Sequence, residues 1–351
     1  MSIESPGLIT VAAYGRGAAS ARVRLHDWVD HLQIPAVSWE YAGTRDAAPR
    51  TLGRRLPAAV RAEVRLRRDA CRVDDSTVLL SRAASPFSNG GLESRLLSTA
   101  RRGVYDFDDS LAHYPDSALR RAWSRRRVWQ RSLASADQVI AGNATLAEEA
   151  RAAAPAGTPV TVVPSCIEPS SYRPKSSYEG RETPRVVWLG SPATEAFLVA
   201  VARSLRACLD RVGGRITVIS AGEGPLGALA PVADRVTWSA DALSLLADAD
   251  VGIMPLPDTP FTRGKCAYKL LQYGATALPV VASPVGVNRD VVTGCGGWAP
   301  ATDTEWDDAL TEVLTAPEYL RASAGRAALA HVQENYSFAS WEPTWRKLVL
   351  G

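Results

Sequence analysis

Short apolar segments alternate with longer amphipathic segments along most of the chain. Leu8–Tyr14 is apolar, and the glycine-containing turn Gly15–Ser20 separates it from a helical pattern over residues 22–32. The predicted strands of the first half are residues 8–14, 36–41, 77–81, 103–107, 136–141 and 158–163. Asn143 is placed to cap the helix that follows the fifth of them. Strands that alternate with helices predict a parallel sheet covered by helices.

A polar stretch over residues 169–184 contains three prolines and shows no periodicity, which is typical of a linker. The alternation then restarts, with predicted strands at residues 185–189, 216–220, 236–238, 251–255 and 279–282. The sequence therefore predicts an N-terminal domain over residues 1–168 and a second domain over 185–335. The fold class is α/β, with two Rossmann-like doubly wound domains facing across an interdomain cleft. Ligands of such sheets bind beyond the carboxyl ends of the strands.

The last segment, residues 336–351, places Phe338, Trp341 and Trp345 at helical spacing. A free tail would not leave so much aromatic surface in water. We expect this segment to form a helix that packs back on the body.

Composition agrees with a cytoplasmic globular protein. At 351 residues with 46% hydrophobic content, two domains are expected. No apolar run approaches the roughly 20 residues of a membrane-spanning helix, and Met1–Pro6 lacks the features of a secretion signal. The five cysteines stand singly, so we expect reduced thiols and neither disulfides nor a zinc site.

The net charge of +3 is modest, but arginine is concentrated in residues 61–72 and 120–131. This local excess suits an anionic partner, or it forms the solvated faces of two helices. We expect small-molecule partners and no nucleic acid, and peripheral contact with a membrane stays open.

The segment Asp258–Tyr273 follows an apolar strand and enters a helix. It brings three cations, Arg263, Lys265 and Lys269, close to one helix start. Such a segment suits a diphosphate, and fixed positive charge would stabilise that group as it leaves. A solvated basic loop is the alternative.

Several segments carry a resemblance to a known family. They are Gly252–Asp258, Arg263–Lys265, Lys269–Tyr273 and Leu278–Pro284 in the second half, and Gly15–Arg24, Tyr105–Asp109, Ala141–Asn143, Val163–Cys166 and Trp188–Pro192 elsewhere. Together they resemble family-4 retaining glycosyltransferases of the GT-B fold, of actinobacterial type. The resemblance covers essentially the whole chain.

The resemblance implies a metal-independent transfer, without cofactor, from a UDP- or GDP-sugar held mainly by the second half. The donor would contact Gly15, Gly17, Ser191, Thr194, Arg263, Gly264, Lys265, Lys269, Leu270 and Gln272. Arg263, Lys265 and Lys269 would hold its diphosphate. Gln272 stands where the family usually has a ribose-binding glutamate, and Ala277 where it often has glycine.

The resemblance places the acceptor in the first half. Asp108 stands where many members carry a histidine near the reacting sugar, and Asp109 follows it; with Arg263 and Lys265 these are the predicted catalytic residues. The predicted acceptor residues are Arg16, Arg22, Arg82, Asn89, Glu93 and Asp106. They suggest a small polar acceptor with an oxygen, nitrogen or sulfur nucleophile, as in the biosynthesis of antibiotics or other secondary metabolites.

Other interpretations remain. A peripheral-membrane or polysaccharide glycosyltransferase of the same fold is one. The turn with Gly15 and Gly17, with Glu40 at the end of the second strand, approaches a dinucleotide fingerprint that lacks its third glycine, which indicates an NAD-dependent oxidoreductase. Asp106 and Asp108 also match the Asp-x-Asp of metal-dependent phosphatases and of GT-A transferases, both of which need a divalent cation.

Overall fold

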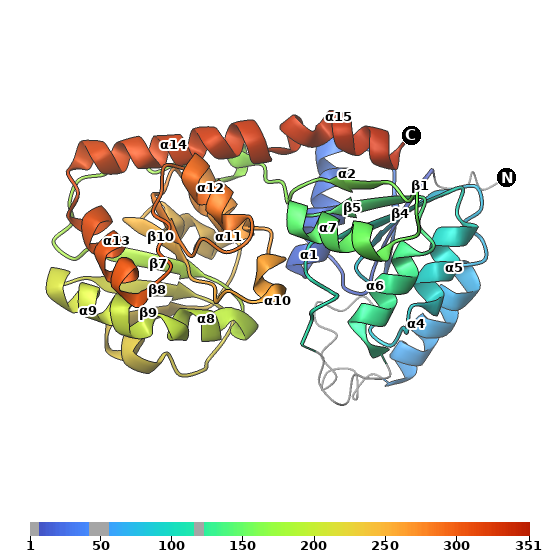
Figure 1. Ribbon diagram of the computed structural model, residues 1–351, viewed down its shortest axis with the longest axis horizontal. Coiled ribbons are helices and arrows are strands. Elements are labelled where there is room, and N and C mark those ends of the chain that lie inside the picture. Colours follow the sequence, from blue (N-terminus) through green and yellow to red (C-terminus); the bar gives the residue numbers. More distant parts are fainter. Residues whose placement is uncertain (1–6, 42–55, 116–122) are drawn as a thin grey trace. The chain divides into compact units, whose positions relative to one another are not determined.

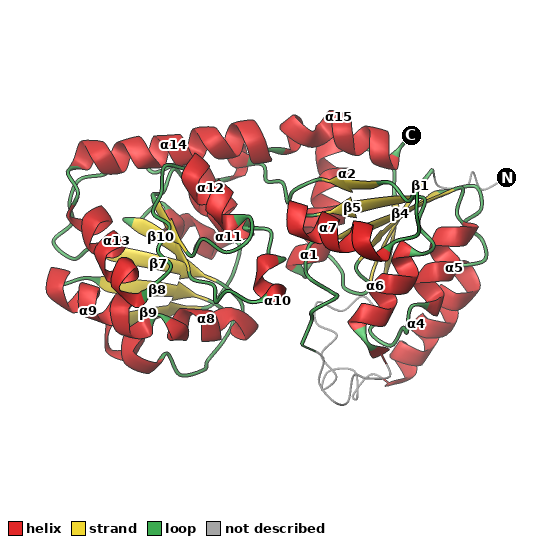
Figure 2. Ribbon diagram, viewed as in Figure 1, coloured by secondary structure: helices red, strands yellow, loops and turns green. Residues whose placement is uncertain are grey.

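The computed structural model describes residues 7–41, 56–115 and 123–351, and the chain forms two compact units. The first unit comprises Met1–Ser165, Gly264–Cys266 and Trp341–Gly351. The second comprises Cys166–Arg263 and Ala267–Ser340. Each unit contains its own parallel sheet flanked by helices (Figures 1 and 2). Met1–Pro6 and residues 120–122 of the second arginine-rich stretch lie outside the described residues.

The first sheet has six parallel strands in the order β2-β1-β3-β4-β5-β6. They are β1 (Leu8–Ala12), β2 (Val37–Glu40), β3 (Thr77–Ser81), β4 (Arg102–Phe107), β5 (Gln138–Ala141) and β6 (Val160–Val162). All six predicted strands of this half are confirmed, although β1 ends two residues before Tyr14. The register pairs Ala12 with Ser81 and Ser81 with Asp106, so the carboxyl ends of β1, β3 and β4 meet at one edge.

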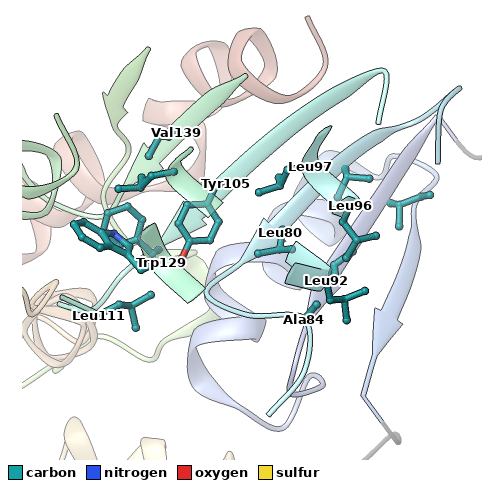
Figure 3. Close-up of a cluster of buried hydrophobic side chains, with 14 of the residues drawn as sticks. Leu80, Ala84, Leu92, Leu96, Leu97, Tyr105, Leu111, Trp129 and Val139 are labelled. Carbon is teal, nitrogen blue, oxygen red and sulfur yellow. The ribbon is translucent and has the colours of Figure 1, made fainter. Parts of the chain in front are cut away.

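One face of this sheet is covered by α4 (Leu56–Asp69), α5 (Gly91–Thr99), α6 (Arg125–Leu133) and α7 (Ala144–Ala153). Their apolar side chains meet those of the strands in a buried core, in which Leu80, Tyr105 and Trp129 lie (Figure 3). Asn143 caps α7 as predicted, because its side chain accepts a hydrogen bond from the backbone N–H of Leu146. The end of β5 and the Asn143 cap together determine where α7 begins.

The opposite face carries the short α1 (Ala19–Ala21), a π-helical turn η1 (Arg22–His26) and α2 (Asp27–Leu32). The C-terminal helix α15 (Phe338–Val349) lies alongside α2 (Figure 1). Trp345 of α15 stacks on Trp28 of α2, with ring centroids 5.2 Å apart and ring planes 12° apart. Arg102 also donates a hydrogen bond to the carbonyl oxygen of Leu348. The C-terminal residues therefore complete the hydrophobic packing of the first unit.

The second sheet has the order β11-β10-β7-β8-β9, again all parallel. Its strands are β7 (Arg185–Leu189), β8 (Arg215–Ile219), β9 (Ala233–Val236), β10 (Val251–Met254) and β11 (Val280–Ala282). The pattern predicted all five, but β9 begins three residues earlier than expected. On one face pack α8 (Glu195–Ala200), α9 (Ala202–Val212) and α13 (Asp303–Thr315), and on the other α11 (Tyr268–Ala275), α12 (Asn288–Gly294) and α14 (Glu318–Tyr336).

Short helical turns complete this unit, namely η3 (Pro169–Ser171), η4 (Pro192–Thr194), η5 (Gly227–Val232), η6 (Asp241–Leu246) and α10 (Pro260–Arg263). Residues 172–184 form no helix or strand, in keeping with the proline-rich pattern. Buried Lys175 donates a hydrogen bond of 2.8 Å to the carbonyl oxygen of Ala249, and the Tyr178 hydroxyl donates to that of Ala277. This irregular segment is therefore fastened to the second unit by side chains.

All five cysteines are free thiols, as expected. Cys166, Cys208 and Cys295 are buried, Cys266 is half-buried and Cys71 is exposed. In the described part of the chain, no helix combines the length and the apolar character needed to cross a membrane.

The stack of Trp345 on Trp28 predicts a large stability effect. Trp345→Ala is expected to lower the free energy of unfolding by about 3–5 kcal/mol, because it removes a buried indole and leaves a cavity. Trp238 is 38% exposed, so Trp238→Ala is the matched control and should cost under about 1 kcal/mol. Urea unfolding measures both, and equal effects of the two substitutions would contradict the packing described.

Candidate functional site

Three carboxylates and three cations gather at the carboxyl edge of the first sheet. Asp106 lies in β4, and Asp108 and Asp109 follow its end. Each carboxylate is paired with a cation: Asp106 with Arg24, Asp108 with Arg82 and Asp109 with Lys265. The three pairs cancel in formal charge, and all of these residues belong to the first unit.

Arg24 reaches Asp106 from the π-helical turn η1. Its Nε lies 3.0 Å and its Nη2 2.5 Å from the two carboxylate oxygens, and Nη1 donates to the carbonyl oxygen of Val163 at 2.9 Å. Both side chains are almost completely buried. Burial alone lowers the pKa of Arg24, but the Asp106 carboxylate outweighs it and holds that pKa above its ordinary value. Since all three guanidinium nitrogens of Arg24 donate to protein oxygens, the pair supports the edge of the sheet from within.

Arg82 follows β3 in a strained backbone conformation. Its φ of 59° lies in the left-handed region, which an arginine adopts only when its surroundings hold it there. The Tyr105 hydroxyl donates to its carbonyl oxygen, and its own Nε donates to Asp108 at 2.6 Å. The strained backbone therefore directs the guanidinium toward the carboxylates.

Asp108 also accepts a hydrogen bond of 2.7 Å from the Ser20 hydroxyl. Burial raises the pKa of Asp108, but the neighbouring Arg82 and Arg24 and the Ser20 bond outweigh burial and leave that pKa below its ordinary value. Asp108 is therefore a carboxylate at neutral pH and acts as a hydrogen-bond acceptor, not as an acid.

Residues 264–266 join this edge through Asn143. Its Nδ2 donates to the carbonyl oxygens of Gly264 and Lys265, each at 3.1 Å. A Cβ at residue 264 would lie 2.9 Å from the backbone nitrogen of Ser110, so glycine permits the close approach. Lys265 then donates to Asp109 at 2.9 Å, and 22% of its side chain remains exposed. A cation of the predicted phosphate segment thus lies beside a predicted catalytic carboxylate.

The other first-half residues predicted to bind the acceptor differ in how far protein contacts already occupy their side chains. Glu93 is buried, and its carboxylate accepts hydrogen bonds from the Ala84 N–H and the Ser88 hydroxyl. It therefore holds the loop after β3. Asn89 accepts hydrogen bonds from the Gly91 N–H and from Arg131.

Arg16 and Arg22 lie in the segment that follows β1. Arg16 forms an exposed bidentate pair with Asp30, and Arg22 lies 3.7 Å from Asp27. These two arginines keep solvent contact, so a ligand can reach them without disturbing a buried group.

Gly15 and Gly17 form the turn after β1. A Cβ at residue 15 would collide with the carboxylate of Glu40, so the glycine allows this acid to reach the turn. Oε1 of Glu40 lies 3.3 Å from Nε2 of His26, which is buried. The acid of the dinucleotide-like pattern therefore lies against protein groups of the first unit.

In the second unit, the predicted donor residues lie near the carboxyl ends of β7 and β10. Arg263, at the end of α10, forms a bidentate pair with Asp258, and both side chains are more than half exposed. Nζ of Lys269 lies 4.8 Å from the ring centroid of Trp188 in β7. Ser191 and Thr194 form a capping box at η4.

Gln272 of α11 is 5% exposed and donates a hydrogen bond of 3.1 Å to the Tyr172 hydroxyl. Leu270, in the same helix, is fully buried in the core of the second unit. Leu270 therefore positions α11, and its side chain contacts protein rather than solvent.

The sequence did not single out Ser20, Tyr14 or Arg125 as site residues. Arg125 begins α6, and its guanidinium carbon lies 3.5 Å from the ring centroid of Tyr114. Tyr14 follows β1, and the rule that ligands bind beyond the carboxyl ends of strands is the one signal in the sequence that could have indicated it. Within the described ranges, no three His, Cys, Asp or Glu side chains are arranged to hold a metal ion.

No protein-family model and no curated protein sequence matches the chain. Solved structures do. Sucrose-phosphate synthase from Thermosynechococcus elongatus aligns over 97% of this chain and 98% of its own, with a TM-score of 0.69 and 16% identity. HepE from Anabaena, in complex with UDP-glucose, aligns over 97% and 98%, with a TM-score of 0.69 and 14% identity.

A glycosyltransferase from Rickettsia africae aligns over 98% of this chain and 99% of its own, with a TM-score of 0.66 and 12% identity. Likeness at such low identity concerns the fold. It shows the fold class that the sequence predicted, an α/β chain of two Rossmann-like units of the GT-B type.

The buried pair predicts a strong dependence of folding on Arg24. Arg24→Met is expected to lower the free energy of unfolding by about 3–5 kcal/mol, because it leaves the Asp106 carboxylate buried without a partner. The same substitution at Arg16, whose pair with Asp30 is exposed, should cost at most about 1 kcal/mol. Urea unfolding compares the two. The double variant Arg24→Met, Asp106→Leu should regain part of the free energy of unfolding that Arg24→Met loses. Such a gain would show that the unpaired charge of Asp106, and not lost packing alone, causes the loss.

Proposed function

We propose that the protein is a retaining glycosyltransferase that moves a sugar from a UDP- or GDP-sugar to a small polar acceptor. The observation that carries this proposal is the likeness to glycosyltransferase structures over 97–98% of the chain, one of them in complex with UDP-glucose. The cationic segment around Arg263 supports it, because a nucleotide donor needs positive charge at its diphosphate.

In this proposal the leaving diphosphate is held by Arg263, Lys265 and Lys269. Arg263 is more than half exposed in its pair with Asp258, so the anion can take over its guanidinium without breaking a buried contact. Lys265 has a fixed position beside Asp109 and still reaches solvent. As the bond to the sugar breaks, these cations stabilise the negative charge that grows on the phosphate oxygen.

The acceptor nucleophile attacks the anomeric carbon from the face that the diphosphate leaves. The bond from that carbon to the phosphate oxygen breaks, and the departing oxygen takes the proton of the acceptor. No side chain forms a covalent bond, and no metal is required. Asp108 and Asp109 accept hydrogen bonds from hydroxyl groups of the donor sugar or of the acceptor, a role that suits carboxylates paired with Arg82 and Lys265.

The nucleotide contacts follow the same assignment. Ser191 and Thr194 lie after β7 and contribute hydroxyl groups, and the turn with Gly15 and Gly17 lets a ligand approach the backbone. Gln272 offers the oxygen of its amide to a ribose hydroxyl, because as oriented its nitrogen is engaged with Tyr172.

The acceptor contacts the first unit, through Arg16, Arg22 and Arg82 and the carboxylates after β4. We propose a cytoplasmic reaction in the synthesis of an antibiotic or another secondary metabolite, with an oxygen, nitrogen or sulfur nucleophile. The polar character of these side chains supports a small hydrophilic acceptor.

Helix α4 supports a second candidate, a glycosyltransferase of the same fold that works at a membrane surface. Ala62, Leu66 and Ala70 face the core, whereas Val60 and Val64 are 56% and 62% exposed. Arg61, Arg65 and Arg68 are exposed at the same helical spacing as these valines. Apolar side chains among arginines on one helical stripe suit a surface of anionic lipid.

The proposed phosphate contacts predict a loss of turnover. Arg263→Ala and Lys265→Ala are each expected to lower kcat about 100- to 1000-fold with UDP- or GDP-sugars, because one cation is missing when the diphosphate leaves. Arg206→Ala, which breaks an exposed pair with Asp210 in α9, is the control and should retain its kcat. Circular dichroism checks the fold of each variant, and near-normal turnover of both would overturn this assignment of the phosphate site.

The membrane candidate predicts binding to anionic vesicles. Replacing Arg61, Arg65 and Arg68 by Gln should weaken binding to phosphatidylserine vesicles by about 3 kcal/mol, roughly a hundredfold, since each arginine contributes about 1 kcal/mol. The same charge change at the exposed Arg173, Arg203 and Arg326 of the second unit is the control. Vesicle sedimentation measures the difference, and the absence of binding by the unaltered protein at low salt would end this candidate.

A further inference from the structure

Among the described residues at the carboxyl edge of the first sheet, Arg125 is a cation that the three ion pairs do not include. Arg125 begins α6, and none of the described carboxylates lies within ion-pair distance of it. Arg24, Arg82 and Lys265 are each matched by an aspartate. Counted over Arg24, Arg82, Lys265, Arg125 and the three aspartates, the described part of this edge therefore carries one more positive than negative charge.

The surroundings of Arg125 come from three elements of the first unit. Tyr14, just after β1, Arg82 after β3 and Asp109 after β4 all act on its side chain electrostatically. Arg125 thus lies where the carboxyl ends of neighbouring strands meet, the position at which sheets of this type bind ligands. It shares this position with the carboxylates that the proposed function uses.

Arg125 is held in a defined orientation. Its guanidinium lies over the ring of Tyr114, 3.5 Å from the centroid, and the ring covers one face of the planar group. Stacking of this kind leaves the N–H groups at the edge of the plane directed outward, in the fork geometry that matches a carboxylate or a phosphate. A long side chain that is already immobilised loses little entropy when it binds an anion.

The charge of Arg125 is also partly withdrawn from water. Burial lowers the pKa of Arg125, and the positive charge of Arg82 lowers it further against the opposing effects of Tyr14 and Asp109. Arginine does not lose its proton in proteins, so the lowered pKa reflects the cost of burying its charge rather than a neutral side chain. A bound anion removes that cost. A solvated or ion-paired arginine, by contrast, would have no such cost to remove.

We propose that Arg125, stacked on Tyr114, binds an anionic group of the acceptor, a carboxylate or a phosphate. This rests on the proposed function, and it narrows the acceptor class from a polar molecule to a sugar acid, a sugar phosphate or a similar anion. Arg125 anchors the acceptor through this group while its nucleophile lies nearer the carboxylates after β4. It is a binding residue and takes no part in bond breaking.

The test uses the full-length protein without any donor. Binding of glucose 6-phosphate, glucuronate and neutral glucose is measured by calorimetry and by the shift of melting temperature. We expect saturable binding of at least one anionic sugar and much weaker binding of glucose. Comparison of glucuronate with glucose 6-phosphate tells whether a carboxylate or a phosphate is preferred, and competition by inorganic phosphate tells whether the anionic group alone suffices.

Arg125→Gln should weaken binding of the anionic sugar about 10- to 100-fold, the effect of removing a charged hydrogen-bond donor. Arg125→Lys, which keeps the charge but not the fork, should fall between this variant and the unaltered protein. Arg127→Gln is the matched control, because it removes an exposed arginine from the same helix and should change binding less than about 2-fold. The melting temperature of each variant without ligand reports on folding.

Equal binding of glucose and the anionic sugars, no binding of any of them, or unchanged binding in Arg125→Gln would each overturn the proposal. These outcomes can be separated from failure of the proposed function. Anionic sugars that bind through Arg125 in a protein that transfers no sugar would leave this inference standing and remove the function. Transfer of sugar to neutral acceptors at a rate that Arg125→Gln does not change would leave the proposed function standing and remove this inference.

Discussion

The organisation of the first unit depends on charge cancellation at the carboxyl edge of its sheet. Three aspartates within four residues would repel one another and resist burial if they stood alone. Arg24, Arg82 and Lys265 each neutralise one of them, and they come from parts of the chain far apart in sequence. Because the partners arrive from such distant segments, the ion pairs also bring those segments together.

Two of the three pairs are obtained by departures from regular backbone. Arg24 lies in a π-helical turn, and Arg82 has a left-handed φ of 59°. Departures of this kind cost free energy and persist where surrounding contacts hold them, most often at functional sites. The pair of Arg24 and Asp106 is buried, whereas Lys265 and Arg82 keep 22% and 33% of their side chains exposed. Burial and solvent access are thus divided between neighbouring pairs at one strand end.

The periodicity of the sequence predicted the architecture well, because strands buried on both faces and amphipathic helices leave a local signal. The eleven strands of the described residues and the Asn143 cap could be predicted in this way. The partners within the site could not. Nothing local in the segment around Lys265 indicates that Asn143 binds its backbone, or that its amine lies beside Asp109. Such contacts depend on tertiary packing, and so does the lack of an ion pair for Arg125 among the described residues, which a count of arginines conceals.

At the buried position 272, an amide in place of a carboxylate alters the hydrogen bonds and the charge that the side chain can offer a ligand. A glutamate here, 5% exposed, would bear the cost of a buried charge unless a donor compensated it. An amide avoids that cost, and its N–H is satisfied by the Tyr172 hydroxyl. The side chain then keeps one acceptor oxygen, enough for one hydroxyl group but without the charge that strengthens a hydrogen bond. If Gln272 binds the ribose, it contributes less binding free energy than a glutamate would. The contacts of Arg263, Lys265 and Lys269 with the diphosphate must then contribute more.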